Sequence, residues 1–394
     1  MPVICPVSRE PFSPSPPPSL SLGVAVCERE GSPPFAEASF IRRLAAAGPR
    51  HGLRVFAFSP WTLDEESGTV TAWLPAGSSW SRETVPAPSL VYDRAWPGDP
   101  LQRRRFRSGL RRLQGSGRAR AALLNGRLPG KLGVFRVLKA DARTASLLPP
   151  TAEYEGPDSL ADWLSRHNGA AFLKPSNGSK GRRVIAVSRH PDDPERLRVR
   201  GRNGANVPFR IEKLPAGEAL GRIDRAIGGR PYIMQPYLDL RGPTGESFDM
   251  RVLMQRDGNG GWTEAGIAAR IGRFGSVTSN LHGGGTAANA SDYLRDLFGD
   301  SESASLLGEM RRAARDVIGR LEGSYGIFCE LGLDFGIDRS GRLWFLEANT
   351  KPGRASMACA GESAAASAVE RPLAYARYIL LRPPGRVFHE FDPM

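Results

Sequence analysis

Two apolar segments near the C-terminus are joined by a short polar turn, and each carries an acidic residue within it. They are "FCELGLDFGID" (328–338) and "RLWFLEAN" (342–349). Their apolar, aromatic-rich composition predicts two strands, and the intervening "DRSG" turn predicts an antiparallel hairpin. If the hairpin turns at Ser340–Gly341, Asp334 lies beside Glu347, while Glu347 and Asn349 share one strand face about 6.6 Å apart.

This arrangement favours a bound cation. Two buried carboxylates with no cation between them repel each other, and one takes up a proton. Two carboxylates and a carboxamide oxygen are instead suitable ligands for Mg²⁺, a hard ion that prefers oxygen. The hairpin therefore predicts Asp334, Glu347 and Asn349 as metal ligands, and an ordinary polar strand end is the alternative.

Length and hydropathy bound the architecture. The chain has 394 residues, enough for two or three domains, and 40% are hydrophobic. No apolar run approaches the roughly 20 residues that span a bilayer, and the N-terminus has no basic region of the kind that opens a signal peptide. We therefore expect a cytoplasmic protein, with a flexible Pro-rich leader over 1–19.

The cysteines and histidines do not indicate a metal or disulfide framework. Four cysteines are widely separated without a C-x-x-C pair, and five histidines form no cluster in the sequence. We expect free thiols. Any metal should therefore be held by carboxylates.

The charge balance points to acidic partners. The formal net charge is +13 and the pI about 10.1, and residues 101–120 contain eight arginines and no acidic residue. That basic segment is either a solvated helix face or a surface for an anionic polymer, nucleotide or acidic peptide. Nucleic acid is disfavoured, because Phe106 is the one aromatic residue there and base stacking needs more.

The order of apolar segments predicts two kinds of domain. Strand-like segments at 21–27, 53–59 and 89–95, with a helical pattern between the first two, predict an N-terminal α/β domain with a parallel sheet over 20–128. From about residue 129 to 384 the pattern becomes α+β, and 385–394 form a tail. The helix at "DSLADWLSRH" is expected to begin at a cap on Asp158 or Ser159.

A glycine-bearing loop joins two strands of the second region. In "FLKPSNGSKGRRVIAVS" (172–188), Lys174 ends a strand, and Gly178, Lys180 and Gly181 follow in the loop. Backbone amides of such a loop can wrap phosphate oxygens. The Walker spacing is absent, however, and a strand rather than a helix follows, so a plain turn is the alternative.

Further polar groups follow along the chain. "PYIMQPYLDL" (231–240) offers an extended segment whose backbone could meet an adenine edge, although a strand ending at Pro236 explains it equally well. Strand alternation places Asp249 and Arg251 on one face, with Arg270 on the next strand. Arginines in this position could neutralise phosphate or bind a carboxylate, or could form surface salt bridges. "SNLHGGGTA" (279–287) suits ligand contact more than packing, and His282 has no metal-ligand partner at suitable spacing.

The order of these motifs resembles the ATP-grasp superfamily over roughly 130–380, and "EANTKPG" is the most specific part. More narrowly, "YDR" (92–94), "LLPPT" (147–151) and "ELGLDFGID…GRLWFLEANTKPGR" look like the YheC/YheD family of spore-coat-associated ATP-grasp proteins. "SNLHGGGTA" is similar to RimK-type amino-acid ligases. The resemblance implies two α+β subdomains that clamp ATP, a small one at about 149–236 and a C-terminal one at about 237–384, preceded by an α/β pre-ATP-grasp domain.

The resemblance also implies roles for individual residues. Arg251 and Arg270 would be catalytic, facing the γ-phosphate and an acylphosphate. ATP would be bound by Lys131, Lys174, Ser176, Gly178, Ser179, Lys180, Gly181, Gln235, Leu238 and Asp239. Asp334, Glu347 and Asn349 would hold two Mg²⁺ ions, with Mn²⁺ as an alternative metal. Substrate contacts would come from Asn280, His282, Gly283, Gly284, Lys351 and Arg354. Gln235 and Arg270 depart from the family pattern, where many members have Glu and several have Lys, respectively.

The expected activity is an ATP- and Mg²⁺-dependent carboxylate–amine or carboxylate–thiol ligase acting through an acylphosphate. Its partners would be ATP and an unidentified carboxylate and amine, with an acidic peptide or a cell-wall precursor as candidate acceptors. Spore-coat proteins are further candidate partners, and the cell would then be a sporulating one. A non-catalytic spore-coat protein that retains the fold is the alternative, and a nucleic-acid-binding protein is the weaker rival.

Overall fold

The computed structural model describes residues 20–115, 120–178, 181–279, 281 and 284–382. The chain forms two compact units, and among the described residues the first covers 20–91, 96–115 and 120–122, and the second covers 92–95, 123–178, 181–279, 281 and 284–382. The expected leader (1–19) and tail (385–394) lie outside the described residues, and the expected domain boundaries stay predictions. No helix in the described part of the chain is both long and apolar enough to cross a membrane.

The first unit contains a six-stranded sheet in the order β4-β3-β2-β1-β5-β6. Its elements are β1 (Leu20–Ala25), α1 (Ala38–Ala47), η1 (Gly48–His51), β2 (Leu53–Phe58), η2 (Pro60–Thr62), β3 (Thr69–Ala76), β4 (Ser79–Pro86), β5 (Leu90–Asp93), α2 (Pro100–Gln114) and β6 (Ala122–Leu123). Strands β1 and β2 are parallel with α1 between them in sequence, as expected. The expectation of a parallel sheet fails at β3 and β4, which add an antiparallel hairpin. Strand β4 is largely polar and exposed, and β3 mixes polar and apolar residues, so the pair gives a weak periodic signal in the sequence.

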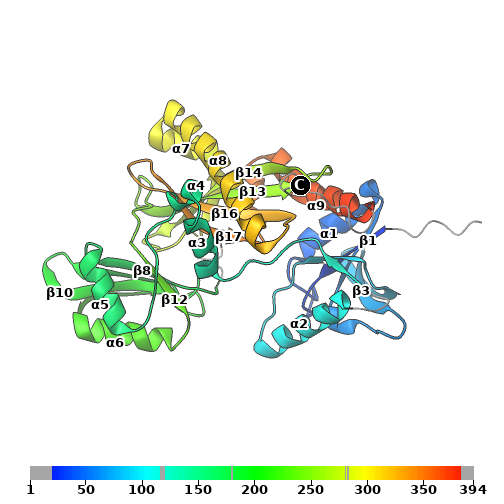
Figure 1. The fold of residues 1–394 in the computed structure, drawn as a ribbon, viewed down its shortest axis with the longest axis horizontal. Coiled ribbons are helices and arrows are strands. Elements are labelled where there is room, and N and C mark those ends of the chain that lie inside the picture. The colour runs from blue at the N-terminus through cyan, green and yellow to red at the C-terminus, as the bar shows by residue number, and fades with distance from the viewer. Residues whose placement is uncertain (1–19, 116–119, 179–180, 280, 282–283, 383–394) are drawn as a thin grey trace, which may run out of the picture. The chain divides into compact units, whose positions relative to one another are not determined.

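The second unit begins with two helices and a second six-stranded sheet, in the order β11-β10-β9-β8-β12-β7. The elements of this part are α3 (Lys131–Lys139), α4 (Ala142–Ala145), β7 (Ala152–Glu153), α5 (Pro157–Arg166), β8 (Ala170–Pro175), β9 (Ile185–His190), β10 (Asp193–Arg202), β11 (Pro208–Pro215), α6 (Ala216–Ile227) and β12 (Tyr232–Gln235). Helices α5 and α6 pack on this sheet around one apolar core (Figure 1). The predicted cap of α5 is wrong: Gly156, with φ of 131°, precedes Pro157 at the helix start, and neither Asp158 nor Ser159 is the cap.

The remaining sheet has five strands in the order β15-β14-β13-β16-β17. The elements of this part are β13 (Glu246–Arg256), β14 (Trp262–Phe274), β15 (Thr286–Asn289), α7 (Ala290–Phe298), α8 (Asp300–Tyr325), β16 (Glu330–Ile337), β17 (Leu343–Asn349), η4 (Ala355–Ala358) and α9 (Glu362–Leu380). Figure 1 shows α8 lying along this sheet, and their side chains share the largest apolar core with those of α3. Parts of η4 and α9 pack on the opposite face, around Leu253 and Ala268.

Candidate active site

The face of the five-stranded sheet opposite α8 is only partly covered by α9 and η4. Strand alternation sends Met250 and Val252 of β13 into the α8 core, and therefore turns Asp249 and Arg251 to the other face. There they line a cleft that the two sheets of the second unit share. Its charged lining residues are Lys131, Lys174, Arg182, Arg241, Arg251, Arg270, Asp249, Asp334 and Glu347. Six positive side chains against three negative ones give this cleft a net positive charge, which suits a polyanion.

A β-bulge brings Glu347 into the cleft. Asp334 pairs with Glu347, as predicted from the sequence, but its neighbour Phe335 pairs with Phe345, so Leu346 is an extra residue on β17. Without this extra residue, Glu347 would point to the same side as Phe345, which belongs to the α8 core. The bulge therefore allows β17 to contribute Phe345 to the core and Glu347 to the cleft.

Lys174 binds to the bulge. Its Nζ donates a hydrogen bond to the Leu346 carbonyl (3.1 Å) and lies 5.4 Å from the centre of the Phe135 ring. The lysine is only 8% exposed. Burial, chiefly, and the neighbouring Lys131 charge lower the pKa of Lys174 to about 8, while Glu347 and Asp334 oppose that shift. A phosphate group in the cleft would stabilise its protonated form.

Lys131 connects the glycine loop to the metal-ligand candidates. It is the first residue of α3, and its Nζ donates to the Gly178 carbonyl (2.7 Å) and lies 3.4 Å from Glu347 Oε2. Its backbone N–H donates to the carbonyl of Ser176 (2.9 Å). Lys131 therefore holds the start of the loop close to β17.

Four charged side chains form a continuous row across β14, β13 and β16. Arg270 donates to both oxygens of Asp249 (2.6 and 2.7 Å) and lies 2.9 Å from Asp334 Oδ2. Arg251 binds both oxygens of Asp334, with Nη2–Oδ2 at 3.0 Å. All four residues are buried. Each guanidinium thus has a carboxylate partner, as a buried charge requires.

This row controls the protonation of Asp334. Burial alone would raise the pKa of the Asp334 carboxyl, but the charges of Arg251 and Arg270 outweigh that effect and hold the pKa below its usual range. In the same way, Asp249 and Asp334 outweigh the effect of burial on Arg270 and raise its pKa. Asp334 and Arg270 are therefore both charged at neutral pH.

The three metal-ligand candidates lie together in the cleft. Asp334 and Glu347 are cross-strand partners, and Asn349 Nδ2 lies 3.4 Å from Asp334 Oδ2. Their all-oxygen donor set fits Mg²⁺. Two arginines already occupy Asp334, however, so it would have to release at least one of these contacts to bind a metal. Within the described residues, no three His, Cys, Asp or Glu side chains gather as a metal site.

The adenine-side candidates divide into two groups. Gln235 and Leu238 line the cleft, and Gln235 Nε2 is held by Thr151 Oγ1 (2.8 Å). Asp239 is not among the lining residues. It accepts two hydrogen bonds from Arg241 (2.5 and 2.8 Å) and lies 3.1 Å from Arg339.

The loop residues are only partly described. Gly178 and Gly181 line the cleft, whereas Ser176 is buried and is not among the lining residues. Gly284, with φ of +84°, accepts a hydrogen bond from Arg273 (3.1 Å) and is not among the lining residues. Ser179, Lys180, Asn280, His282 and Gly283 lie outside the described residues.

The candidate substrate residues Lys351 and Arg354 make polar contacts outside the cleft, Lys351 with Asp93 and Arg354 with the buried Glu330. Lys351 Nζ is 2.6 Å from Asp93 Oδ1, and Arg354 Nη2 is 2.5 Å from Glu330 Oε2. Neither residue lines the cleft. Glu330 also accepts hydrogen bonds from Tyr92, Arg94 and Gln255, at 2.5, 3.2 and 3.0 Å.

Glu330 and the role of Asp249 were not predicted from the sequence. A charged residue four positions before Asp334 in an apolar strand, and therefore on the same face, was the available signal for Glu330. For Asp249 the signal was its place two residues before Arg251 and on the same face. Both residues provide counter-ions to buried arginines.

Comparison with known proteins gives consistent matches. A family model described as YheC/D-like ATP-grasp matches residues 120–379, about two thirds of the chain. The endospore coat-associated protein YheD of Bacillus subtilis (strain 168) is 28% identical over 327 residues, covering 82% of this chain and 69% of YheD. The endospore coat-associated protein YheC of the same organism is 25% identical over 329 residues, covering 82% of this chain and 86% of YheC. Among solved structures, the D-cycloserine synthetase DcsG superposes with a TM-score of 0.51 at 13% identity, covering 91% of this chain and 98% of that chain.

Proposed function

The chain belongs to the YheC/D-like ATP-grasp family and has the ATP-grasp fold, and from that premise we propose that it is an ATP- and Mg²⁺-dependent ligase that joins a carboxylate to an amine or thiol. ATP binds in the cleft of the second unit. Its reaction proceeds through an acylphosphate.

One observation carries this proposal. Two lysines and two arginines from four separate elements (α3, β8, β13 and β14) converge on the cleft that contains Asp334, Glu347 and Asn349. These cations are Lys131, Lys174, Arg251 and Arg270. Arg251 and Arg270 already have Asp249 and Asp334 as partners, so Glu347 and Asn349 are additional oxygen-bearing side chains beside that row.

The chemistry balances without a nucleophilic side chain. An oxygen of the substrate carboxylate attacks the γ-phosphorus of ATP, the bond to the β-phosphate oxygen breaks, and ADP leaves. An amine or thiol then attacks the acyl carbon, its proton is released, and phosphate leaves with the electrons of the C–O bond. Arg251 and Arg270 offset the charge that develops on the transferred phosphoryl group, and Lys131 and Lys174 bind the phosphates of the nucleotide.

Asp334, Glu347 and Asn349 would hold the metal. Bound there, Mg²⁺ supplies charge neutralisation for the phosphate oxygens. Because Asp334 is engaged by Arg251 and Arg270, it would have to release one of them to hold the metal. A phosphate group provides those arginines with a replacement anion.

The test combines binding and turnover. ATP affinity is measured by calorimetry with and without Mg²⁺, and ADP release is measured with pooled amino acids and acidic peptides as substrates. We expect Mg²⁺-dependent ATP binding that Glu347→Gln with Asn349→Ala abolishes, and substrate-dependent ADP release in the native protein. ATP binding unaffected by that double substitution would contradict the assigned metal ligands, and ATP binding with no ADP release from any substrate pool would count against a ligase.

A second candidate, a non-catalytic spore-coat protein, has one observation in its favour. Asp334 is fully engaged by Arg251 and Arg270, so the row is stable without a metal or nucleotide. Both curated relatives are named as endospore coat-associated. Under this candidate, the double substitution at Glu347 and Asn349 leaves coat association unchanged.

A further inference from the structure

Helix α2 of the first unit has one buried face. Its buried residues are Phe106, Gly109, Leu110 and Leu113. A Cβ at Gly109 would lie 2.5 Å from the carbonyl carbon of Pro60 and 2.6 Å from the backbone nitrogen of Trp61. The helix and η2 are therefore in backbone contact at this glycine, which fixes the direction of the opposite face.

Six arginines lie on the exposed part of α2, and within the described part of the chain two of them have a side-chain partner. Arg105 lies over the Trp61 ring (5.2 Å), and Arg112 lies 3.2 Å from Glu65. The other four are Arg103, Arg104, Arg107 and Arg111, and all are exposed. No carboxylate among the described residues forms an ion pair with any of these four.

These four arginines form a single stripe, here called the α2 stripe. Arg103, Arg107 and Arg111 are spaced four residues apart. Each therefore lies about 6 Å further along the same side of the helix than the one before it. Arg104 is three residues before Arg107 and lies beside them. Like charges at this spacing destabilise a helix by about 0.2–0.5 kcal/mol per pair. An anionic partner bound to the stripe would remove this repulsion.

We propose that the α2 stripe is a docking surface for an acidic polypeptide segment in extended conformation. Alternate side chains of an extended strand point to one side and are about 6.6 Å apart, close to the 6 Å repeat of Arg103, Arg107 and Arg111. Carboxylates at alternate positions therefore meet successive guanidinium groups, whose forked geometry binds carboxylates bidentately.

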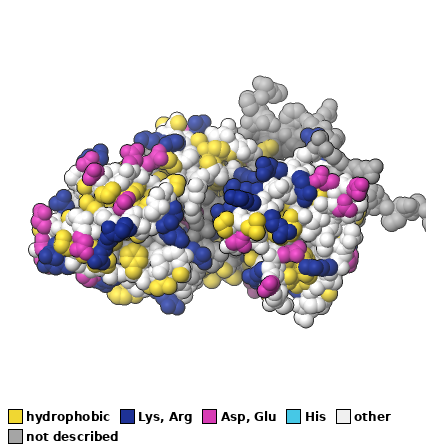
Figure 2. All heavy atoms as spheres, turned by 90° about the horizontal axis from the view of Figure 1, so that it is seen from below, with side chains coloured by type: hydrophobic (Ala, Val, Ile, Leu, Met, Phe, Trp, Pro, Cys, Tyr) yellow, Lys and Arg dark blue, Asp and Glu magenta, His cyan; other side chains and the backbone are white. Residues whose placement is uncertain are grey.

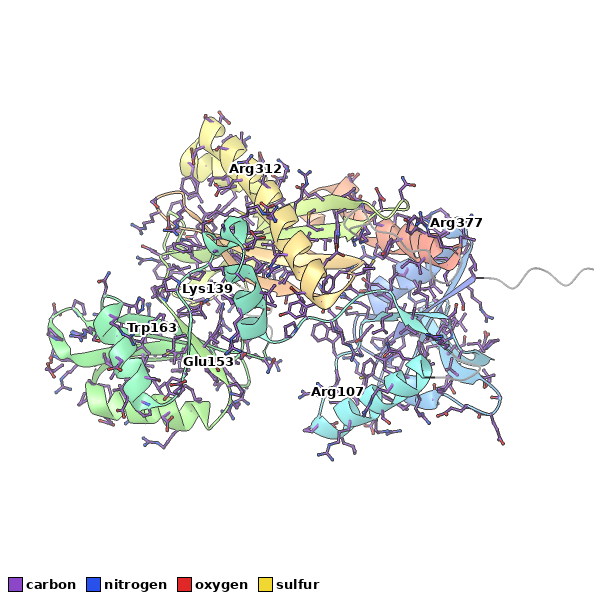
Figure 3. The ribbon with its side chains drawn as sticks, viewed as in Figure 1. Arg107, Lys139, Glu153, Trp163, Arg312 and Arg377 are labelled. Carbon is purple, nitrogen blue, oxygen red and sulfur yellow. The ribbon has the colours of Figure 1, made fainter. Side chains whose placement is uncertain are left out.

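The aromatic content of α2 favours a peptide over a nucleic acid. Single-stranded nucleic acids are bound by basic grooves together with aromatic side chains on which bases stack. The one aromatic side chain of α2, Phe106, is only 4% exposed and belongs to the buried face. Figure 2, viewed from below Figure 1, shows Lys and Arg side chains gathered on the surface where α2 lies, and Figure 3 labels Arg107 on that helix.

This docking does not depend on the proposed ligase activity, because it needs neither ATP nor turnover. The experiment measures binding alone. A short fluorescein-labelled peptide in which Glu alternates with Thr is titrated with the full chain, and anisotropy is recorded at low and at physiological salt. The probes for comparison are the same peptide with Gln in place of Glu, and a single-stranded oligonucleotide of equal charge.

Two variants remove the same charge from different places. The stripe variant carries Arg103→Gln, Arg107→Gln and Arg111→Gln. The control variant carries Arg295→Gln, Arg312→Gln and Arg315→Gln on exposed positions of α7 and α8; Arg312 is labelled in Figure 3. Because all six positions are exposed, we expect both variants to keep the native circular dichroism spectrum and melting temperature.

We expect the stripe variant to bind the Glu peptide about tenfold more weakly than the native chain, since three exposed charge pairs are lost. The control variant should bind within twofold of the native chain, and the Gln peptide should not bind. Equal losses in both variants would mean that net charge alone attracts the peptide, and would overturn the proposal. The proposal would also be overturned if the Glu peptide did not bind to the native chain. The same holds if the oligonucleotide bound more tightly than the Glu peptide and the stripe variant lost that binding.

Discussion

Glu330 provides the sharpest stability prediction, because it is a carboxylate with no exposed surface and four hydrogen-bond donors around it. The substitution Glu330→Gln keeps the shape and removes the charge. Two of the four donors are the guanidinium groups of Arg94 and Arg354, at 3.2 and 2.5 Å. Both would then lose this carboxylate as a partner, and the new amide N–H would face donors rather than acceptors.

The expected loss follows from these contacts. A hydrogen bond to a charged group contributes about 1.5–3 kcal/mol, and removing one partner of a buried ion pair costs about 3–5 kcal/mol. We therefore expect Glu330→Gln to lower the free energy of local opening of β16 by about 3–5 kcal/mol. The matched control is Glu218→Gln, the same substitution in an exposed pair with Arg222, where the loss should stay below about 0.5 kcal/mol.

Hydrogen exchange measured by mass spectrometry is the suitable assay, because the chain has two units and one global unfolding curve would mix them. The peptide to follow covers residues 328–337. Adding Arg354→Met to Glu330→Gln should recover part of the loss, since one guanidinium group instead of two then faces the uncharged side chain. If Glu330→Gln alone lowers the free energy of local opening of β16 by less than about 1 kcal/mol, the view that Glu330 is the required counter-ion is refuted.

The same carboxylate gives a pH dependence. Burial would raise the pKa of Glu330, but Arg354 and Arg94 outweigh it, and hydrogen bonds from Tyr92 and Gln255 add to the lowering. A lowered folded-state pKa contributes stability above the unfolded value of about 4.3, and this stability is lost as the pH falls through the folded-state pKa. The stability gap between the native chain and Glu330→Gln should therefore be constant near neutral pH and shrink below about pH 4.

Three further predictions concern the cleft and its support. Because the pKa of Lys174 is about 8, ATP affinity measured by calorimetry should fall as the pH rises from 7 to 9, and Lys174→Met should remove most of that dependence; an unchanged slope would contradict the assignment. Asp249→Asn should reduce the rate of ADP release about 10²-fold, because the Arg270 guanidinium loses the carboxylate that orients it. Ser279→Ala, which removes one hydrogen bond to Asp249, should reduce that rate less than tenfold. Equal effects of the two substitutions would show that the carboxylate charge is not what matters. Gly332→Ala places a Cβ 2.7 Å from Pro352 Cβ and should lower the free energy of local opening of β16, measured by hydrogen exchange, by about 1–3 kcal/mol. Gly319→Ala, a helical position with nothing within 4 Å, should leave the exchange of α8 unchanged or slow it; similar effects of the two substitutions would mean that Pro352 moves freely.

The sequence predicted the cleft residues best where they follow from the alternation of side chains along one strand. Alternation placed Asp249 and Arg251 together, and the "DRSG" turn set the register that makes Asp334 and Glu347 partners. These inferences needed only the two-residue period of a strand and one short turn. The same reasoning found β1, β2 and the helix between them.

Contacts between distant segments could not be predicted in this way. Lys351 pairs with Asp93, and Arg354 contacts both Glu330 and Tyr92. Asp93 and Tyr92 each lie more than 250 positions away from the residue that they contact. Nothing in the local pattern of "KPGR" distinguishes a residue that meets a substrate from one that meets a buried carboxylate. Strands β3, β4, β10 and β11 were missed for a related reason, since their mixed polar and apolar residues give a weak periodic signal.

The bulge at Leu346 shows why the cleft depends on more than its ligands. Plain alternation would direct Phe345 and Glu347 to the same face, yet one belongs in the core and the other in the cleft. The extra residue resolves that conflict at the cost of a ladder interruption beside Leu346, and its carbonyl accepts a hydrogen bond from Lys174. A side chain expected to bind phosphate therefore also stabilises the backbone that orients an expected metal ligand. Replacing Lys174 should consequently weaken Mg²⁺ binding as well as ATP binding, whereas a lysine that met only the nucleotide would affect ATP alone.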